Sequence, residues 1–310
     1  MSQPFRNSYL FAAIITVIGA ILFSTKAVLI KLAYQHPIDS LSLLSLRMLF
    51  SLPFFIGMLL FRKSTALDSP IQAKDWLKMA AIGISGFYCA SYLDFIGLQY
   101  ISASLERMVL YIYPTLVLII SAIFFQKKIT KIQYVALFLS YVGVAIIFSG
   151  KISTVGNSNP MLGAFFVFFA ALTYAIFIVG SGQLLPRIGT RRFTSYSMIA
   201  AAIAVIVHNT IANGFDLLKY PLEIYGIVLF MAIFATVLPT FLIAEGIRIF
   251  GANNSSIIGT IGPVSTIVLA YIFLGERLYL MQMLGTLFVI SGVLLITLNK
   301  HSEKRVEKRD

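Results

Sequence analysis

With 310 residues the chain is long enough for a large core, but its composition excludes a water-soluble one. Apolar residues make up 59% of the sequence and charged residues only 12%, and the mean hydropathy is +0.90. A soluble domain carries roughly 25% charged residues, so the polar surface is too small to coat a body of this size. The formal net charge of +12 comes largely from short Lys and Arg clusters between apolar runs. Such clusters are typical of membrane topology signals and argue against a nucleic-acid partner.

The sequence predicts neither a disulfide nor a metal site. Cys89 is the only cysteine, and the three histidines (His36, His208 and His301) are scattered without ligand spacing. We therefore expect no metal and no other cofactor.

Ten apolar runs are long enough to cross a bilayer as helices. A hydrocarbon core about 30 Å thick is spanned by roughly 20 apolar residues in helical form, and backbone groups in lipid must be paired within the segment. In chain order the expected helices are 10–33, 41–61, 76–98, 102–125, 131–149, 161–183, 193–213, 223–247, 252–274 and 279–299. The sequence therefore predicts an all-α integral membrane protein with short links and no separate soluble domain.

The distribution of basic residues predicts the orientation. With both termini in the cytoplasm, most of the 24 Lys and Arg residues fall in cytoplasmic segments, and the outer links hold only Lys151, Lys219 and Arg277. Cytoplasmic loops are enriched in Lys and Arg, so this arrangement is the expected one. We expect a multi-pass protein of the cell inner membrane, in contact with membrane lipids.

An internal repeat relates the two halves. A shift of 149 residues places Gly97, Ala103, Pro114, Phe124, Gln133 and Gly143 on Gly246, Ala252, Pro263, Phe273, Gln282 and Gly292. This predicts two five-helix units, 10–149 and 161–299, followed by a basic cytoplasmic tail, 300–310. Because five is an odd number, the second unit must be inserted upside down relative to the first. Inverted repeats are typical of transporters, which bind their solute near mid-membrane at the repeat interface.

Several of these residues resemble a known family. In the second half they are Gly251, Ala252, Pro263, the stretch Leu274-Gly275-Glu276-Arg277, Gln282, Gly285, Gly292 and Val293. This pattern is similar to an EamA domain of the drug/metabolite transporter superfamily. The first half matches through Arg47, Gly97, Ser102, Ala103, Pro114 and Gly143, and departs at Gln126-Lys127, where the family usually shows Gly-Glu.

The resemblance implies ten helices with both ends inside and alternating access to a central cavity. It also implies transport, often outward, of amino acids, other metabolites or toxic compounds. We expect a secondary transporter, an exporter rather than an enzyme, of a small organic metabolite such as an amino acid or another carboxylate-bearing solute. The alternative is a membrane-embedded enzyme acting on lipid or lipid-linked substrates, and association of two copies into a homodimer is left open.

Charged residues inside the apolar runs are the candidate solute-binding groups. A charge in a spanning helix costs roughly 2.5–3.5 kcal/mol on insertion scales, so it usually faces a cavity or a partner. Five such residues fall in the outer half of the first four helices: Lys26, Arg47, Asp94, Glu106 and Arg107. Their net charge of +1 favours a carboxylate or phosphate on the solute, held by Lys26 or Arg47. The alternative is that Arg47 pairs with Glu106 or Asp94, and Arg107 with the other acid, to lock the helices.

Three further residues and one further role complete the candidate site. Tyr111 lies four residues after Arg107 and shares its helix face, so we expect it to line the solute path. Glu106, in a medium that disfavours charge, is a hypothetical proton carrier that would couple transport to the proton gradient. Pro114 and Pro263, expected in mid-helix at equivalent repeat positions, would kink their helices and act in gating, or serve as purely structural bends.

Overall fold

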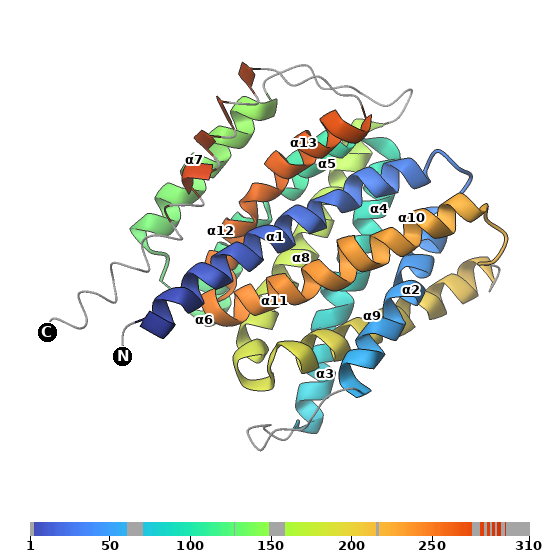
Figure 1. Cartoon of the computed structure of the whole chain (residues 1–310), viewed down its shortest axis with the longest axis horizontal. Coiled ribbons are helices and arrows are strands. Elements are labelled where there is room, and N and C mark those ends of the chain that lie inside the picture. Colours follow the sequence, from blue (N-terminus) through green and yellow to red (C-terminus); the bar gives the residue numbers. More distant parts are fainter. Residues whose placement is uncertain are drawn as a thin grey trace, which may run out of the picture.

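The computed structural model describes residues 3–60, 71–126, 128–148, 159–214 and 217–274, together with 280–281, 284–285, 287–288, 290–292 and 295. These residues form helices joined by short links, with no strand among them (Figure 1). The helices of the first half are α1 (Gln3–Ala33), α2 (Ser40–Leu60), α3 (Ala73–Gly83), α4 (Ala90–Tyr100), α5 (Ala103–Leu110), α6 (Tyr113–Phe125) and α7 (Lys131–Phe148). Those of the second half are α8 (Pro160–Ile188), α9 (Thr190–Asn213), α10 (Leu222–Ala232), α11 (Leu238–Phe250), α12 (Ala252–Ile258) and α13 (Gly262–Leu274).

The expected all-helical membrane character is confirmed, whereas the number of ten spans stays a prediction. Among the described residues, 6 helical stretches are long and apolar enough to cross a membrane: Leu10–Ala33, Ser40–Leu60, Ala73–Tyr100, Met161–Ile188, Thr190–Asn213 and Leu222–Phe250. Tyr113–Phe125 and Val264–Phe273 are shorter apolar helices. Most of the expected helix 279–299, the Gly275-Glu276-Arg277 motif and the tail 300–310 lie outside the described residues.

Two of the expected helices each contain a π-helical segment. The first, η1 (Ile84–Cys89), joins α3 to α4, and the second, η2 (Ile233–Val237), joins α10 to α11. A π-helical turn closes its hydrogen bonds over five residues instead of four and is frequent at functional sites. Sequence periodicity does not reveal such a segment, because the apolar run passes through it without interruption.

The expectation that Pro114 and Pro263 kink continuous helices is wrong. The run 102–125 is divided into α5 and α6 by a turn at Tyr111 and Ile112. The run 252–274 is divided into α12 and α13 by a 3₁₀ turn, Gly259–Ile261. Each proline is the second residue of the following helix, where its missing N–H leaves no hydrogen bond unmade. The prolines therefore begin new helices instead of bending old ones.

The helix boundaries recur at the same 149-residue offset that relates the sequence halves. Four elements of the first half begin at Ala73, Ile84, Ala103 and Tyr113, and their counterparts begin at Leu222, Ile233, Ala252 and Gly262. The π-helical segments and the breaks before the prolines are thus repeated along with the helices.

Helices of the two halves pack in an exchanged pattern. The first helix of the first half, α1, packs against α11, and α8, which opens the second half, packs against α4. Figure 1 shows α1 and α11 crossing the molecule side by side. The second helices of the halves, α2 and α9, pack against each other. The two halves therefore contact each other through equivalent surfaces, as a pseudo-two-fold relation requires.

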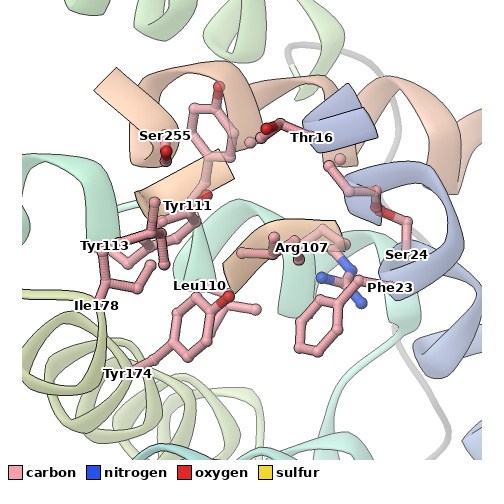
Figure 2. Close-up of a pocket in the computed structure, with 15 residues that line it drawn as sticks. Thr16, Phe23, Ser24, Arg107, Leu110, Tyr111, Tyr113, Tyr174, Ile178 and Ser255 are labelled. Carbon is pink, nitrogen blue, oxygen red and sulfur yellow. The ribbon is translucent and has the colours of Figure 1, made fainter. Parts of the chain in front are cut away.

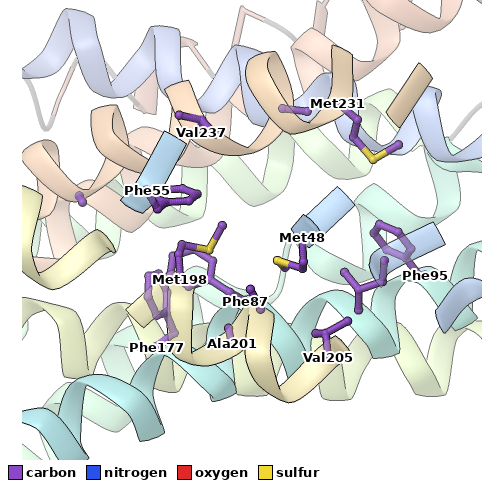
Figure 3. Close-up of a cluster of buried hydrophobic side chains, with 14 of the residues drawn as sticks. Met48, Phe55, Phe87, Phe95, Phe177, Met198, Ala201, Val205, Met231 and Val237 are labelled. Carbon is purple, nitrogen blue, oxygen red and sulfur yellow. The ribbon is translucent and has the colours of Figure 1, made fainter. Parts of the chain in front are cut away.

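A large apolar cluster fills the space between α2, α4, α8, α9, α10 and α11. Phe55, Phe95 and Phe193 are among its largest fully buried side chains. Figure 3 shows side chains from different helices meeting in this cluster, including Met48, Phe87 and Phe177. The cluster gives the surrounding helices a fixed frame against which the site is built.

Candidate functional site

The first cavity lies between the two halves of the chain. It encloses about 590 Å³ of space free of protein atoms, including its open mouth. Its lining comes from α1, α5, α8, α11 and the broken segments around Tyr111 and Gly259, with one charged residue, Arg107, among the described lining residues. Figure 2 shows Arg107, Tyr111, Tyr113 and Tyr174 around this space. The cavity is therefore largely apolar, with a guanidinium group and several hydroxyl groups as its polar features.

A second cavity adjoins the first and encloses about 460 Å³ by the same measure. Arg47, Ser91, Thr236 and Thr240 supply its polar groups, and Phe87 and Phe177 are among its apolar ones. It lies between α2, α4 and α8 on one side and η2 and α11 on the other. This cavity, like the first, is therefore built by both halves.

Four residues line both cavities: Phe23, Tyr174, Ile243 and Ile247. The rings of Phe23 and Tyr174 are stacked, with centroids 5.9 Å apart and planes 12° apart. The ring of Tyr113 meets that of Tyr174 edge-on, with the two centroids 5.2 Å apart. The stacked pair from α1 and α8 therefore lies on the wall that the two spaces share.

The structure buries all five predicted charged residues. Lys26, Arg47, Asp94, Glu106 and Arg107 are each exposed by 5% or less. Lys26 Nζ of α1 lies 2.7 Å from Asp94 Oδ2 of α4, and the same Nζ lies 4.7 Å from the centroid of the Phe23 ring. Lys26 is thus engaged by an acid and an aromatic face, and its ammonium group ties α1 to α4.

Glu106 and Arg107 form a second buried pair on α5. Arg107 Nε lies 3.2 Å from Glu106 Oε2. Arg107 Nη2 has no hydrogen-bond partner in the part of the chain that the structure describes, and the Glu106 carboxyl group also interacts with that of Asp94. Unpartnered buried polar groups of this kind are costly unless something else satisfies them. Arg107 is the member of this pair that lines the first cavity.

Arg47 does not pair with either acid, contrary to one of the two alternatives drawn from the sequence. Its Nη2 donates a hydrogen bond to Ser91 Oγ at 3.0 Å, and its guanidinium carbon lies 5.1 Å from the centroid of the Phe95 ring. Its Nε has no hydrogen-bond partner among the described residues. Arg47 therefore keeps donor capacity and lines the second cavity, while its hydrogen bond to Ser91 joins α2 to α4.

The residues singled out from the sequence are divided between the two cavities. Tyr111 is buried and lines the first cavity together with Arg107, as expected from their shared helix face, and its ring meets Tyr141 edge-on. Lys26, Asp94 and Glu106 are not among the residues that line either cavity. Sequence reasoning missed Phe23, Tyr174 and Thr236, because nothing in an apolar helix distinguishes a cavity-lining residue from a lipid-facing one.

The charged cluster belongs to the first half of the chain alone. At the 149-residue offset, the counterparts of the five charged residues are the uncharged Ala175, Tyr196, Ile243, Ser255 and Ser256. The backbone is repeated, whereas the buried chemistry is not. In the described residues no group of three or more His, Cys, Asp and Glu side chains is placed to hold a metal ion.

Comparison with known families accounts for the repeated architecture. A model of the EamA-like transporter family matches residues 10–149 and, a second time, residues 161–298. The chain belongs to the EamA-like transporter family. The resemblance drawn from the sequence motifs is thereby confirmed. Together with the long apolar helices, membership makes the chain a multi-pass membrane protein of a transporter family.

Relatives of this EamA protein carry consistent names. The uncharacterized transporter YcbK of Bacillus subtilis is 34% identical over 288 residues, covering 90% of this chain and 91% of the relative. The uncharacterized transporter YyaM of the same organism is 28% identical over 226 residues, covering 72% of each chain. An uncharacterized transporter of Archaeoglobus fulgidus is 26% identical, covering 79% of this chain and 86% of the relative. These names favour a transporter over a membrane-embedded enzyme.

A solved structure shares the fold of this EamA chain. It is a protein crystal structure that superposes with a TM-score of 0.72 at 15% sequence identity. The match covers 93% of this chain and 96% of the other. The arrangement of helices is therefore one that occurs in an experimentally determined protein.

Proposed function

We propose that the protein is a secondary transporter that moves a small carboxylate-bearing metabolite, such as an amino acid or another organic acid, by alternating access. One observation carries the proposal: two adjoining cavities lie between halves of the chain that pack in an exchanged pattern. Each cavity contains a buried guanidinium group with at least one donor that has no partner among the described residues. Transporters built from internal repeats place their solute at the interface between the repeats.

The membrane arrangement belongs to the proposal. Ten helices in two inverted units of five, with both termini in the cytoplasm, agree with the Lys and Arg distribution. The recurrence of helix boundaries at the 149-residue offset and the double family match support two equivalent units. Export across the inner membrane is proposed from the direction that is common in the family.

Arg107 is the proposed anchor for the solute carboxylate in the first cavity. A guanidinium group offers a planar fork of donors that matches a carboxylate, and its Nη2 has no hydrogen-bond partner among the described residues. Tyr111 and Tyr113 line the same space and offer ring faces to the apolar part of the solute. A bound carboxylate would thus accept a hydrogen bond from Arg107 Nη2, which has no other partner among the described residues.

Glu106 is the proposed proton carrier. It is fully buried, and the charged neighbours that act on it are Arg107, Asp94 and Lys26. Protonation of Glu106 would change the charge of this cluster from +1 to about +2, since a buried carboxylate loses its charge when it binds a proton. A more positive cluster attracts an anion more strongly, which couples proton binding to solute binding.

Transport by purified protein in sealed liposomes tests the proposal. Liposomes are loaded with a panel of radiolabelled amino acids and organic acids, and efflux is compared with that from protein-free liposomes. We expect protein-dependent efflux of at least one carboxylate and none of the corresponding amide. Absence of flux for every carboxylate, or conversion of a lipid-linked substrate by the protein in detergent, would contradict the proposal.

A further inference from the structure

The second cavity is bordered by both π-helical segments of the described chain. Gly86 and Phe87 come from η1, and Ala235 and Thr236 come from η2. A side chain at Gly86 would collide with the Phe177 ring, since an added Cβ would lie 2.2 Å from its Cγ. The glycine lets Phe177 reach its place in the wall. Two irregular segments at equivalent repeat positions, meeting at one cavity, mark it as a built feature rather than a packing void.

The polar groups of this cavity favour an anionic ligand. Arg47 is 2% exposed, and its Nε has no hydrogen-bond partner among the described residues. The hydroxyl of Thr236 donates to the carbonyl of Met231, and that of Thr240 donates to the carbonyl of Thr236. Both threonine hydroxyl donors are therefore already used, and Arg47 supplies the charged donor of this cavity beside the hydroxyls of Ser91 and Tyr174.

The same lining disfavours an amino group on the ligand. The described residues that line the second cavity include no acidic side chain. Asp94, the nearest acid in sequence to Ser91, is already paired with Lys26. An ammonium group brought into this space would lack a counter-charge, and a buried unpaired charge is costly. The rings of Phe23, Phe87, Phe177 and Tyr174 instead suit an apolar body.

We propose that the second cavity is a separate binding station for a small apolar carboxylate that has no amino group. Arg47 holds the carboxylate there, and the solute passes between this station and the first cavity at the stacked rings of Phe23 and Tyr174. This inference rests on the proposed transport function, and it narrows the solute class from carboxylates in general to amine-free ones.

Single cysteines can report on the two cavities separately. Cys89 is the only cysteine in the chain, so Cys89→Ser gives a cysteine-free background. In that background Thr236→Cys places a reporter in the second cavity and Ser255→Cys places one in the first. In detergent, the rate at which methyl methanethiosulfonate modifies the single cysteine is measured at increasing concentrations of 3-phenylpropionate or phenylalanine. These two probes differ only in the amino group. Ala235→Cys serves as a second reporter if Thr236→Cys is not monodisperse.

We expect 3-phenylpropionate to slow modification at both reporters. At Thr236→Cys, the concentration of phenylalanine that gives the same protection should be about tenfold or more higher than that of 3-phenylpropionate, because its ammonium group lacks a counter-charge there. Adding Arg47→Gln should raise the concentration of 3-phenylpropionate needed at Thr236→Cys by about tenfold or more, the usual effect of losing a hydrogen bond to a charged group. Protection at Ser255→Cys should change by less than about twofold, since Arg47 does not line the first cavity.

Two outcomes would overturn the separate binding station without touching the proposed function. One is protection at Ser255→Cys with none at either second-cavity reporter. The other is an equal effect of Arg47→Gln at both cavities, which indicates one common site. Equal protection by phenylalanine and 3-phenylpropionate at Thr236→Cys would overturn the amine-free class. Failure of carboxylate flux in liposomes, by contrast, would overturn the proposed function itself.

Discussion

Gly246 of α11 lies directly against Thr16 of α1, so close that a Cβ added to the glycine would lie 2.0 Å from Thr16 Oγ1. Gly97 of α4 has the same relation to α8, where an added Cβ would lie 2.5 Å from Val167 Cγ2. The two glycines are equivalent residues of the repeat. Small residues let membrane helices approach closely, and here the same device is used at the α1–α11 contact and at the equivalent α4–α8 contact.

Replacing Gly246 should therefore weaken the contact between α1 and α11. We expect Gly246→Ala to destabilise the protein by about 1–3 kcal/mol, the typical cost of forcing extra atoms into a packed site. The measurement is the apparent Tm of the purified protein in detergent. Gly226→Ala is the matched control, because nothing lies within 4 Å of a Cβ added there. Equal shifts for the two variants would show that the close approach is not the reason for the glycine.

The buried Lys26–Asp94 pair gives a second stability prediction. Lys26→Met or Asp94→Leu alone leaves one buried charge without its partner, and we expect each to cost about 3–5 kcal/mol. The double variant removes both charges and should recover most of the lost stability, because well-packed apolar residues can replace a buried pair. Apparent Tm values of the four proteins complete the cycle. Additive losses in the double variant would exclude direct coupling.

Arg107 should control solute affinity. We expect Arg107→Gln to raise the KM for carboxylate efflux from liposomes by about tenfold or more, because a charge-assisted hydrogen bond to the solute is lost. Arg248→Gln is the control, since Arg248 forms a partly exposed ion pair with Glu245 three residues away on the same helix. Its KM should be unchanged. An unaltered KM in Arg107→Gln, with normal folding, would remove Arg107 from the site.

Glu106→Gln tests proton coupling. In wild-type liposomes a more alkaline outer solution should accelerate efflux, since the proton bound at Glu106 would leave together with the solute and be released outside. Gln cannot take up a proton, so the variant should transport at a rate independent of the imposed pH gradient. Flux is measured at matched internal pH with the gradient present and collapsed by a protonophore. A variant that keeps the full gradient response would assign the coupling to another group.

The inverted repeat is tested at two equivalent exposed residues. Lys74 in the first turn of α3 and Glu223 in the first turn of α10 are separated by 149 residues. In the Cys89→Ser background, Lys74→Cys and Glu223→Cys should react with a membrane-impermeant maleimide from opposite sides of the membrane. We expect Lys74→Cys to be labelled only after cells are opened and Glu223→Cys in intact cells. Labelling of both from the same side would exclude an upside-down second half.

Hydropathy and repeat spacing predicted the helices well, because a bilayer constrains helix length and composition strongly. The start of α2 at Ser40 and the end of α9 at Asn213 follow from these signals. The breaks at Tyr111 and Gly259 did not, and Pro114 was wrongly placed in mid-helix. Proline is compatible with both a kink and a helix start, and only the packing around it decides which occurs.

The candidate site was predictable only where charge made it visible. Arg47 and Arg107 stand out in apolar helices, and the structure buries both at cavities. Their partners were not predictable, because pairing depends on the relative rotation of helices that sequence spacing leaves undetermined. Phe23 and Tyr174 carry no sequence signal at all, since an aromatic ring serves equally well against lipid, in a core or on a cavity wall.

The confinement of the charged cluster to one half has an energetic consequence. In alternating access by inverted repeats, the two end states exchange the conformations of the halves. Two identical halves would make those states equal in free energy by symmetry. Here Lys26 and Asp94 of the first half correspond to the uncharged Ala175 and Ile243 at the equivalent positions of the second half. Under the proposed alternating access, symmetry therefore no longer holds the two forms of the solute-free protein at equal free energy, and the sequence difference between the halves decides which form is favoured.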